Sequence, residues 1–188
     1  LENIEYIIGR PTKEKKMTTA IVFDTETTGL LRPSANKLED QPYLTEIFAY
    51  KVDENAEIVD KFESLVRPPI PVPEKITRLT RINDQMLASA PNFRKLYPDL
   101  AKFFLGSSFL VAHNASFDVG ILETELRRID KLTQFPWPPH HICTAEYSTA
   151  INGSRMSLKN LCKHITGEGV SGHHRAQNDV DALLMCFR

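Results

Sequence analysis

Short runs of apolar, β-branched and aromatic residues recur along the chain and predict strands. Five such runs stand at Ala20–Phe23, 43–52, 58–66, 109–112 and around Ile142. Polar turn residues at 53–55 join the second run to the third, which favours antiparallel pairing among the first three. Segments 31–42 and 67–73 are rich in proline and polar residues and therefore predict loops.

Other apolar residues recur every three to four positions, which is the spacing of one helix face. Helices are predicted at 91–104, 117–129, 157–164 and from Ala176 to the end of the chain. Pro98 interrupts the first of these patterns and leaves its start open. Antiparallel strands followed by an alternation of strands and helices are typical of an α/β protein. We therefore predict a mixed five-stranded sheet, three antiparallel strands and then parallel ones, flanked by helices.

Composition adds limits to this picture. The chain has 188 residues, of which 41% are hydrophobic, enough for one compact core. We interpret 1–17, with its charged run, as an N-terminal extension to a domain at 18–188. A formal net charge of −1 excludes a globally basic nucleic-acid binder, so nucleic acid would need a local patch or bound cations. No membrane-length apolar run and no signal-peptide core is found, and the expected location is the cytoplasm.

Cysteine and histidine spacings give no strong signal for a metal. Cys143, Cys162 and Cys186 are widely separated, and with the neighbouring histidines they fit no closed four-ligand zinc pattern. Reduced thiols are the simplest interpretation.

Two acids stand at the end of the first predicted strand. Asp24 and Glu26 are two residues apart, so both carboxylates lie on one face of the strand and could share a cation. Such a pair alone is weak evidence, because it arises often by chance.

Two further acids stand beside apolar helical stripes. Asp118 and Asp179 would each lie next to the buried face of a helix, where an unpartnered carboxylate is costly. Placement in a first turn, with Ser116 as the cap, is an alternative explanation for Asp118. His174 precedes Asp179 by five residues and would supply a base near neutral pH; adjacent His173 lacks that offset.

Four clustered acids would repel one another unless hard divalent ions neutralised them, and carboxylates suit Mg²⁺ or Mn²⁺. Two such ions can hold the attacking and leaving oxygens of a phosphodiester in line. The pattern therefore predicts phosphodiester hydrolysis.

Three segments carry a family resemblance: Asp24–Leu30 (DTETTGL), Ala112–Asp118 (AHNASFD) and His174–Ala182 (HRAQNDVDA). In order and spacing they resemble the three motifs of the DEDD exonucleases. The arrangement of His174, four further residues and then Asp179 resembles that of the DEDDh subgroup of the DnaQ-like superfamily. This subgroup includes the proofreading epsilon subunit of bacterial polymerase III. This resemblance implies a ribonuclease H-like fold and a 3′-to-5′ exonuclease. It would release nucleoside 5′-monophosphates from single-stranded or mismatched DNA 3′ ends.

The resemblance also implies individual roles. Asp24 would bridge two ions, Mg²⁺ or Mn²⁺, and Glu26 and Asp179 would complete the tighter site. Asp118 would hold the second ion largely through water, and His174 would be the general base.

Further residues would contact the substrate by the same resemblance. They are Thr27, Asn114 and Phe117 around the terminal nucleotide and Ile82 as a base-stacking wedge. Ile82 lies in the segment 76–91, which resembles the family's segment that packs against the 3′ end. The usual His-Gly before this wedge is replaced here, within 80–83, and the loop at 31–42 is longer than in compact members.

Two other functions stay open at this point. The first is a 3′-to-5′ exoribonuclease of the oligoribonuclease or ribonuclease T kind, because the same metal site cuts either backbone and sugar choice rests on a few 2′-hydroxyl contacts. The second is a non-catalytic domain that binds nucleic acid or scaffolds a polymerase. The expected partners are a DNA 3′ end, with RNA possible, and a DNA polymerase subunit.

Overall fold

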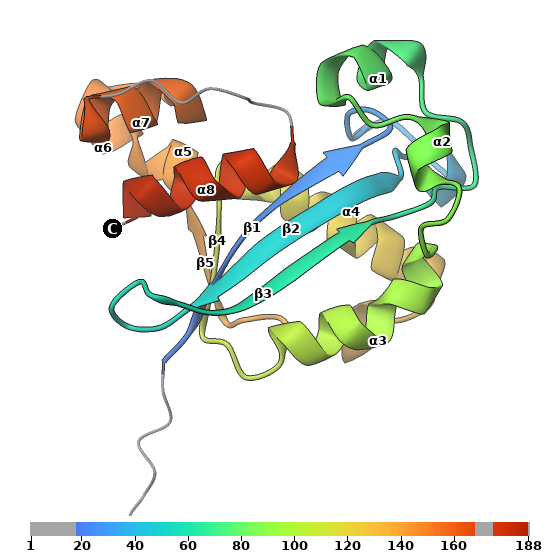
Figure 1. The fold of residues 1–188 in the computed structure, drawn as a ribbon, viewed down its shortest axis with the longest axis horizontal. Coiled ribbons are helices and arrows are strands. Elements are labelled where there is room, and N and C mark those ends of the chain that lie inside the picture. The colour runs from blue at the N-terminus through green and yellow to red at the C-terminus, as the bar shows by residue number, and fades with distance from the viewer. Residues whose placement is uncertain (1–17, 168–174, 188) are drawn as a thin grey trace, which may run out of the picture.

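The structure is a computed structural model, and it describes residues 18–167 and 175–187 of the chain. Among these residues, one sheet holds β1 Ala20–Thr27, β2 Leu44–Val52, β3 Ile58–Leu65, β4 Phe109–Ala112 and β5 His140–Cys143 (Figure 1). The helices are α1 Glu74–Thr80, α2 Asp84–Leu87, α3 Phe93–Phe104, α4 Ala115–Arg128, α5 Thr144–Tyr147, α6 Thr149–Asn152, α7 Leu158–Thr166 and α8 Ala176–Phe187. The same residues include two 3₁₀ turns, η1 Leu38–Asp40 between β1 and β2 and η2 Leu132–Gln134 between α4 and β5. The predicted extension at 1–17 lies outside the described residues.

The strand order is β3-β2-β1-β4-β5. β1 pairs antiparallel with β2 and β2 with β3, whereas β4 runs parallel to both β1 and β5. The predicted mixed five-stranded sheet is therefore confirmed. The pairing of β1 with β4 ends at Val22 opposite Val111, so the C-terminal half of β1 extends past its parallel neighbour.

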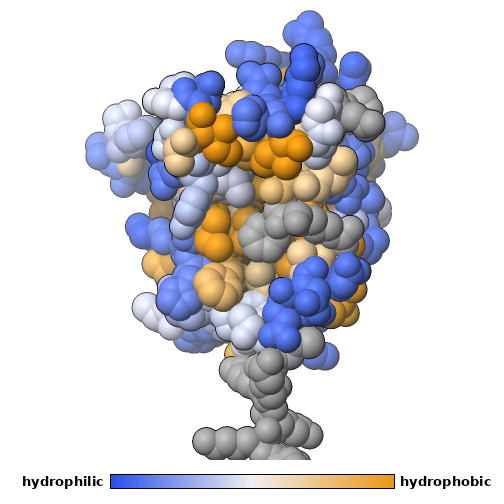
Figure 2. Space-filling view, turned by 90° about the vertical axis from the view of Figure 1, so that its left-hand side faces the viewer, coloured by the Kyte–Doolittle hydropathy of each residue, from blue (hydrophilic) through white to orange (hydrophobic). Residues whose placement is uncertain are grey.

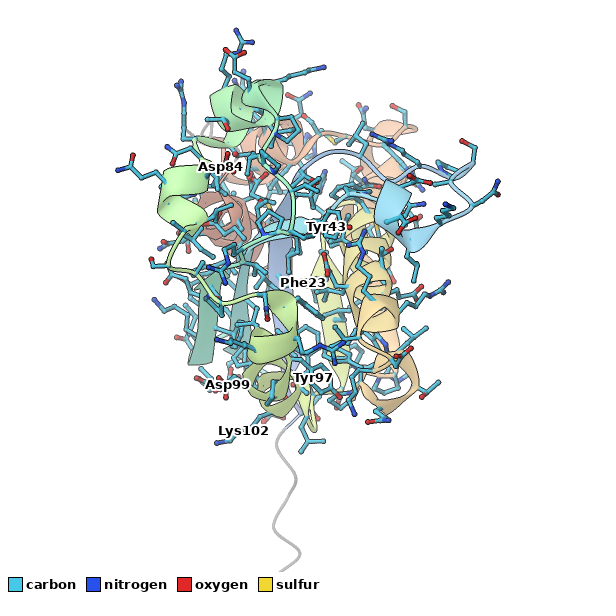
Figure 3. All side chains as sticks on the ribbon, turned by 90° about the vertical axis from the view of Figure 1, so that its right-hand side faces the viewer. Phe23, Tyr43, Asp84, Tyr97, Asp99 and Lys102 are labelled. Carbon is cyan, nitrogen blue, oxygen red and sulfur yellow. The ribbon has the colours of Figure 1, made fainter. Side chains whose placement is uncertain are left out.

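Side chains of β1 alternate between the two faces of the sheet, as in any strand. Ile21 and Phe23 join a core built with α3 and α4, whereas Val22 joins a second core with α8. Figure 1 shows α8 across one face and α4 behind the other. Figure 3 shows Phe23 on the side of α3 and α4. By this alternation Asp24 and Glu26 belong to the α8 face.

The four predicted helices correspond to α3, α4, α7 and α8, with ends displaced by a few residues. α3 begins after Asn92, whose side chain accepts a hydrogen bond from the Lys95 amide. Pro98 lies inside α3 on its exposed side, where water can replace the missing backbone hydrogen bond. Asp99 and Lys102 point outward on the same helix (Figure 3). α1, α2, α5 and α6 were not predicted, because helices of four to seven residues are too short to show an apolar period.

The long loop at 31–42 is fixed to α4 by Arg128. The guanidinium donates to three backbone carbonyls of the loop and its end, those of Leu38, Gln41 and Pro42, at 2.6, 2.8 and 3.0 Å. It also stacks 3.7 Å from the ring centroid of Tyr43 and pairs with Glu125 at 2.8 Å. A loop held by this many contacts is part of the folded domain.

Figure 2 views the face on which α5, α6 and α7 lie, and it shows apolar surface bordered by hydrophilic side chains. Ile151 of α6 and Ile165 of α7 are each about half exposed. Within the described part of the chain, no helix combines the length and hydrophobicity that crossing a bilayer requires.

Candidate active site

Three carboxylates meet at the C-terminal end of β1. Asp24 and Glu26 come from β1 and Asp179 from the first turn of α8, and one oxygen of each lies within 4.8 Å of the others. Strand alternation aims the first two at the face that α8 covers. Val180 and Leu183 pack α8 onto that face, which places Asp179 over the strand end. The sequence prediction that these three acids converge is therefore matched by the geometry.

Asp118 approaches the same strand from α4, on the other face of the sheet. Its side chain is buried, as its position on the helix stripe predicts. Oδ1 accepts hydrogen bonds from the Thr25 amide at 3.0 Å and from the Thr25 hydroxyl at 2.6 Å. Thr25 lies beyond Val22, where β1 has passed its pairing with β4, so the carboxylate satisfies a strand amide that β4 leaves unpaired.

Asp118 does lie in the first turn of α4, but Ser116 is not the cap. Asn114 occupies the N-cap position, with a left-handed φ of 68° that asparagine tolerates better than most residues. The macrodipole and the hydrogen bonds to Thr25 both favour a carboxylate at this position.

Burial and repulsion from neighbouring carboxylates raise the pKa values of Asp24, Glu26 and Asp118. Burial, and then the charges of Asp118 and Asp179, hold the pKa of Asp24 well above its usual range. Burial, followed by the charge of Asp179, raises the pKa of Glu26 to about 8. The pKa of Asp118 rises to about 7, chiefly through burial, although its hydrogen bonds from Thr25 act in the opposite direction.

The donor atoms and the raised pKa values together indicate which ligand the site would accept. The donor atoms are carboxylate oxygens, half-buried and converging, and the residues around them carry too little positive charge to keep the pKa values of Asp24 and Glu26 low. A hard divalent cation is the partner that such a set of ligands prefers, and it would offset both burial and repulsion. The residues therefore fit Mg²⁺ or Mn²⁺.

His174, the predicted general base, lies outside the described residues, and so does His173. The described chain resumes at Arg175, four residues before Asp179. The role of His174 stays a prediction from the sequence.

A cleft of about 610 Å³ lies beside Glu26, between the end of β1 and α1. Two of the predicted substrate residues, Thr27 and Phe117, line this cleft. The Thr27 hydroxyl donates to the Gly29 carbonyl at 2.6 Å and so shapes the turn after β1. Asn114 is exposed ahead of α4 and is not among the residues that line the cleft.

The prediction for Ile82 needs correction. Its side chain is 0% exposed and packs with Val72 and Leu87 in a small core of its own. A residue in that position presents no face on which a base could stack. The residue is apolar because the chain between α1 and α2 turns inward there.

Sequence reasoning placed a substrate-facing segment at 76–91 but singled out Ile82 within it and not the apolar residues that do line the cleft. Leu30 and Leu79 are 77% and 47% exposed, and Ile76 lies one helical turn before Leu79. The spacing of Ile76 and Leu79, three residues apart among polar neighbours, is the signal that could have indicated an apolar helix edge at this place.

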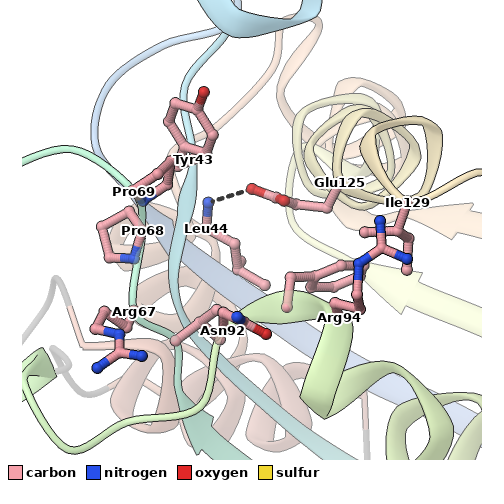
Figure 4. A pocket seen from close by; sticks show the side chains of 11 residues that line it. Tyr43, Leu44, Arg67, Pro68, Pro69, Asn92, Arg94, Glu125 and Ile129 are labelled. Atoms are coloured by element: carbon pink, nitrogen blue, oxygen red, sulfur yellow. Dashed lines mark hydrogen bonds between the residues drawn. The ribbon is translucent and has the colours of Figure 1, made fainter.

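A second cavity, of about 280 Å³, lies between the start of β2, α3 and α4 (Figure 4). Glu125 reaches toward it, and its carboxylate accepts a hydrogen bond from the Leu44 amide at 3.0 Å. Burial raises the pKa of Glu125, and the pairing with Arg128 lowers it in part. Both partners of this acid are structural, so it supports the fold.

Comparison with known proteins agrees with this geometry. The model of a family described as exonuclease matches residues 21–187. A DNA polymerase III PolC-type of Staphylococcus epidermidis is 37% identical over 181 residues, which covers 95% of this chain and 12% of that protein. The corresponding protein of Staphylococcus aureus is 37% identical over 174 residues, covering 92% and 11%. The chain thus spans about an eighth of the length of these curated relatives.

Solved structures give the same fold. Exonuclease X in complex with 5′ overhanging duplex DNA has a TM-score of 0.60 and 27% identity, with 89% of each chain covered. A 3′-exonuclease solved for its recognition of the histone mRNA stem-loop has a TM-score of 0.70, covers 91% of this chain and 62% of that one, and is similar in fold alone at 14% identity. With the family model matching nearly the whole chain and the acids of its motifs gathered at β1, the chain belongs to the exonuclease family of DnaQ-like proteins.

Proposed function

We propose that this domain is a metal-dependent 3′-to-5′ exonuclease acting on DNA. The observation that carries the proposal is the convergence of Asp24, Glu26 and Asp179 beside a cleft large enough for a nucleotide. Asp118 adds a fourth acid within electrostatic reach of Asp24. The product would be a nucleoside 5′-monophosphate.

In this proposal the acids hold two divalent cations, Mg²⁺ or Mn²⁺. The ions supply Lewis-acid stabilisation of the phosphoryl oxygens and lower the pKa of the attacking water. Asp24, Glu26 and Asp179 would ligate them directly, and Asp118 would contribute from the Thr25 side. His174 would take the proton from the attacking water, as its place in the sequence motif implies.

The cleft gives the terminal nucleotide a place next to the acids. Leu30, Ile76 and Leu79 offer apolar surface for a base, while Thr27 and Phe117 border the sugar end in this proposal. Only a splayed end fits a local cleft of this kind, so single-stranded or mismatched 3′ ends are the proposed substrates.

DNA is proposed over RNA because of the relatives. The PolC-type proteins are DNA polymerases by name, and exonuclease X was solved with duplex DNA. A proofreading role beside a polymerase is part of the proposal, because the longer relatives of which this chain matches a segment are DNA polymerases by name.

A product ladder tests direction and sugar choice together. Single-stranded DNA and RNA of one sequence, labelled at the 5′ end, are incubated with Mg²⁺, Mn²⁺ or a chelator. We expect labelled products that shorten one nucleotide at a time, faster for DNA. An early labelled mononucleotide would refute the direction, faster RNA shortening would favour an exoribonuclease, and binding without shortening would favour a non-catalytic domain.

A further inference from the structure

A fifth acid, Glu46, lies on β2 directly opposite Glu26 of β1. It is 4% exposed and no motif of the sequence analysis includes it. Its carboxylate accepts hydrogen bonds from the Arg175 guanidinium: Nη2 donates to Oε1 at 2.6 Å, and Nε donates to each oxygen at 3.1 Å. The amide of Ala176 donates to Oε2 at 3.0 Å. Four donor contacts on one buried carboxylate make a rigid joint between β2 and the start of α8.

This joint caps α8 from another element. The first amides of a helix have no partner within the helix, and a carboxylate there also favours the positive end of the macrodipole. From β2, Glu46 supplies both a hydrogen-bond acceptor for the Ala176 amide and a negative charge at the start of α8. The Arg175 carbonyl in turn accepts from the Asp179 amide at 3.2 Å. One residue thus links the Glu46 carboxylate to the backbone of Asp179.

A second joint fixes the same helix on the other side of Asp179. Glu46, Phe48 and Tyr50 alternate along β2 and so share the face that α8 covers. The Tyr50 hydroxyl donates to Asp181 Oδ1 at 2.9 Å, and Phe48 packs into the core with Val180. Asp179 lies between the two joints, so the helix can neither slide nor rotate without breaking one of them.

The charges matter as well as the geometry. Glu46 lies close enough to Glu26 and Asp24 to repel both. The Arg175 guanidinium offsets this repulsion while lying beside the cluster and outside its ligand set. A mere counter-charge and a positioning device therefore make opposite predictions when Arg175 is removed.

We propose that Glu46 and Arg175 are positioning residues that hold Asp179 where it can share a divalent cation with Asp24 and Glu26. The inference rests on the proposed function, since it concerns the cation site of that reaction.

The test is Mn²⁺ binding by titration calorimetry on the full chain, with kcat and KM for DNA measured alongside. Arg175→Gln leaves the cluster more negative, so a counter-charge role predicts tighter Mn²⁺ binding. The positioning role predicts binding weaker by about 10- to 100-fold and a fall in kcat of similar size with KM nearly unchanged. Arg175→Lys restores the charge without the two-pronged contact and should recover only part of the loss.

Two further variants complete the design. Glu123→Gln changes an exposed, ion-paired glutamate of α4 and should bind Mn²⁺ as the parent does. Tyr50→Phe removes one hydrogen bond of the second joint and leaves the contacts of Glu46 in place, so it shows separately whether the second joint also positions Asp179. It should weaken Mn²⁺ binding about threefold. If Arg175→Gln does not fold, Arg175→Lys keeps the test decisive, because a counter-charge role predicts that it binds Mn²⁺ as the parent does.

Unchanged or tighter Mn²⁺ binding in Arg175→Gln, or binding equal to the parent's in Arg175→Lys where the former is unfolded, would overturn the inference. This result is distinct from failure of the proposed function, which would appear as a parent protein that shortens no substrate.

Discussion

The acidic cluster should make the metal-free protein less stable as the pH rises. Glu26 is the clearest case, because its pKa rises from 4.5 to about 8 on folding. Between these values the unfolded chain releases a proton that the folded chain keeps, so the free energy of unfolding falls as pH increases. Below about pH 4.5 this penalty is absent, and above about pH 8 it is complete. Glu26→Gln removes the titrating group and should therefore stabilise the metal-free protein at high pH.

The magnitude follows from the proton difference. One proton retained across the interval changes stability by about 1.4 kcal/mol per pH unit, which gives about 3 kcal/mol between about pH 5.5 and pH 8. Asp118, with a pKa of about 7, adds to the parent's slope over the lower part of this range. Between about pH 5.5 and pH 8, Glu26→Gln should lose about 3 kcal/mol less free energy of unfolding than the parent does. This difference corresponds to roughly 6–12 °C in Tm for a chain of this size.

The assay is urea unfolding, followed by circular dichroism, at several pH values with chelator and again with saturating Mn²⁺. Mn²⁺ should raise the stability of the parent most at high pH, where the carboxylates are ionised, and should not stabilise Glu26→Gln to the same extent. Glu123→Gln, an exposed glutamate, serves as the matched control and should follow the parent curve. A parent whose metal-free stability is flat or rises across this pH range would refute the reasoning, and so would a Glu26→Gln protein that is no more stable at pH 8.

Three other variants test the surrounding structure. Thr25→Val removes the 2.6 Å hydroxyl contact to Asp118 and should lower kcat about tenfold while the chain stays folded; an unchanged kcat would contradict the role of that contact. Arg128→Met removes the contacts that hold the loop at 31–42 and should lower the free energy of opening this loop by about 3 kcal/mol. Trypsin should then cleave within the loop faster than in the parent, whereas equal cleavage would show that the anchor is dispensable. Leu79→Ala trims the cleft and should raise KM for DNA about threefold with stability changed by less than about 0.5 kcal/mol, so that a normal KM would remove this residue from the substrate surface.

Local sequence patterns predicted most of the strands and the long helices of the fold. Each apolar run became a strand within a few residues, and the long helices followed their apolar period, because burial of these faces drives the packing. The acids of β1 were placed correctly by strand alternation alone. Asp118 was predicted to be buried for the same kind of reason, from its position on a helix stripe.

What depended on long-range contacts could not be predicted. Glu46 is an ordinary polar residue of a strand until α8, 129 residues away, brings Arg175 to it. Ile82 carries no local signal of its inward turn, which is decided by packing against Val72 and Leu87. The same limit applies to the short helix α1, whose contribution to the cleft arises only when it folds beside the end of β1.

The most direct test of the central claim is the initial rate of nucleotide release from single-stranded DNA as Mg²⁺ is titrated, for the parent and for Asp24→Asn. The account predicts no release with chelator, a rate that rises and saturates with Mg²⁺, and a loss of more than about 100-fold in Asp24→Asn with the fold retained. Release that persists in chelator, or an Asp24→Asn protein as active as its parent, would contradict the claim that these carboxylates form a cation-dependent hydrolytic centre.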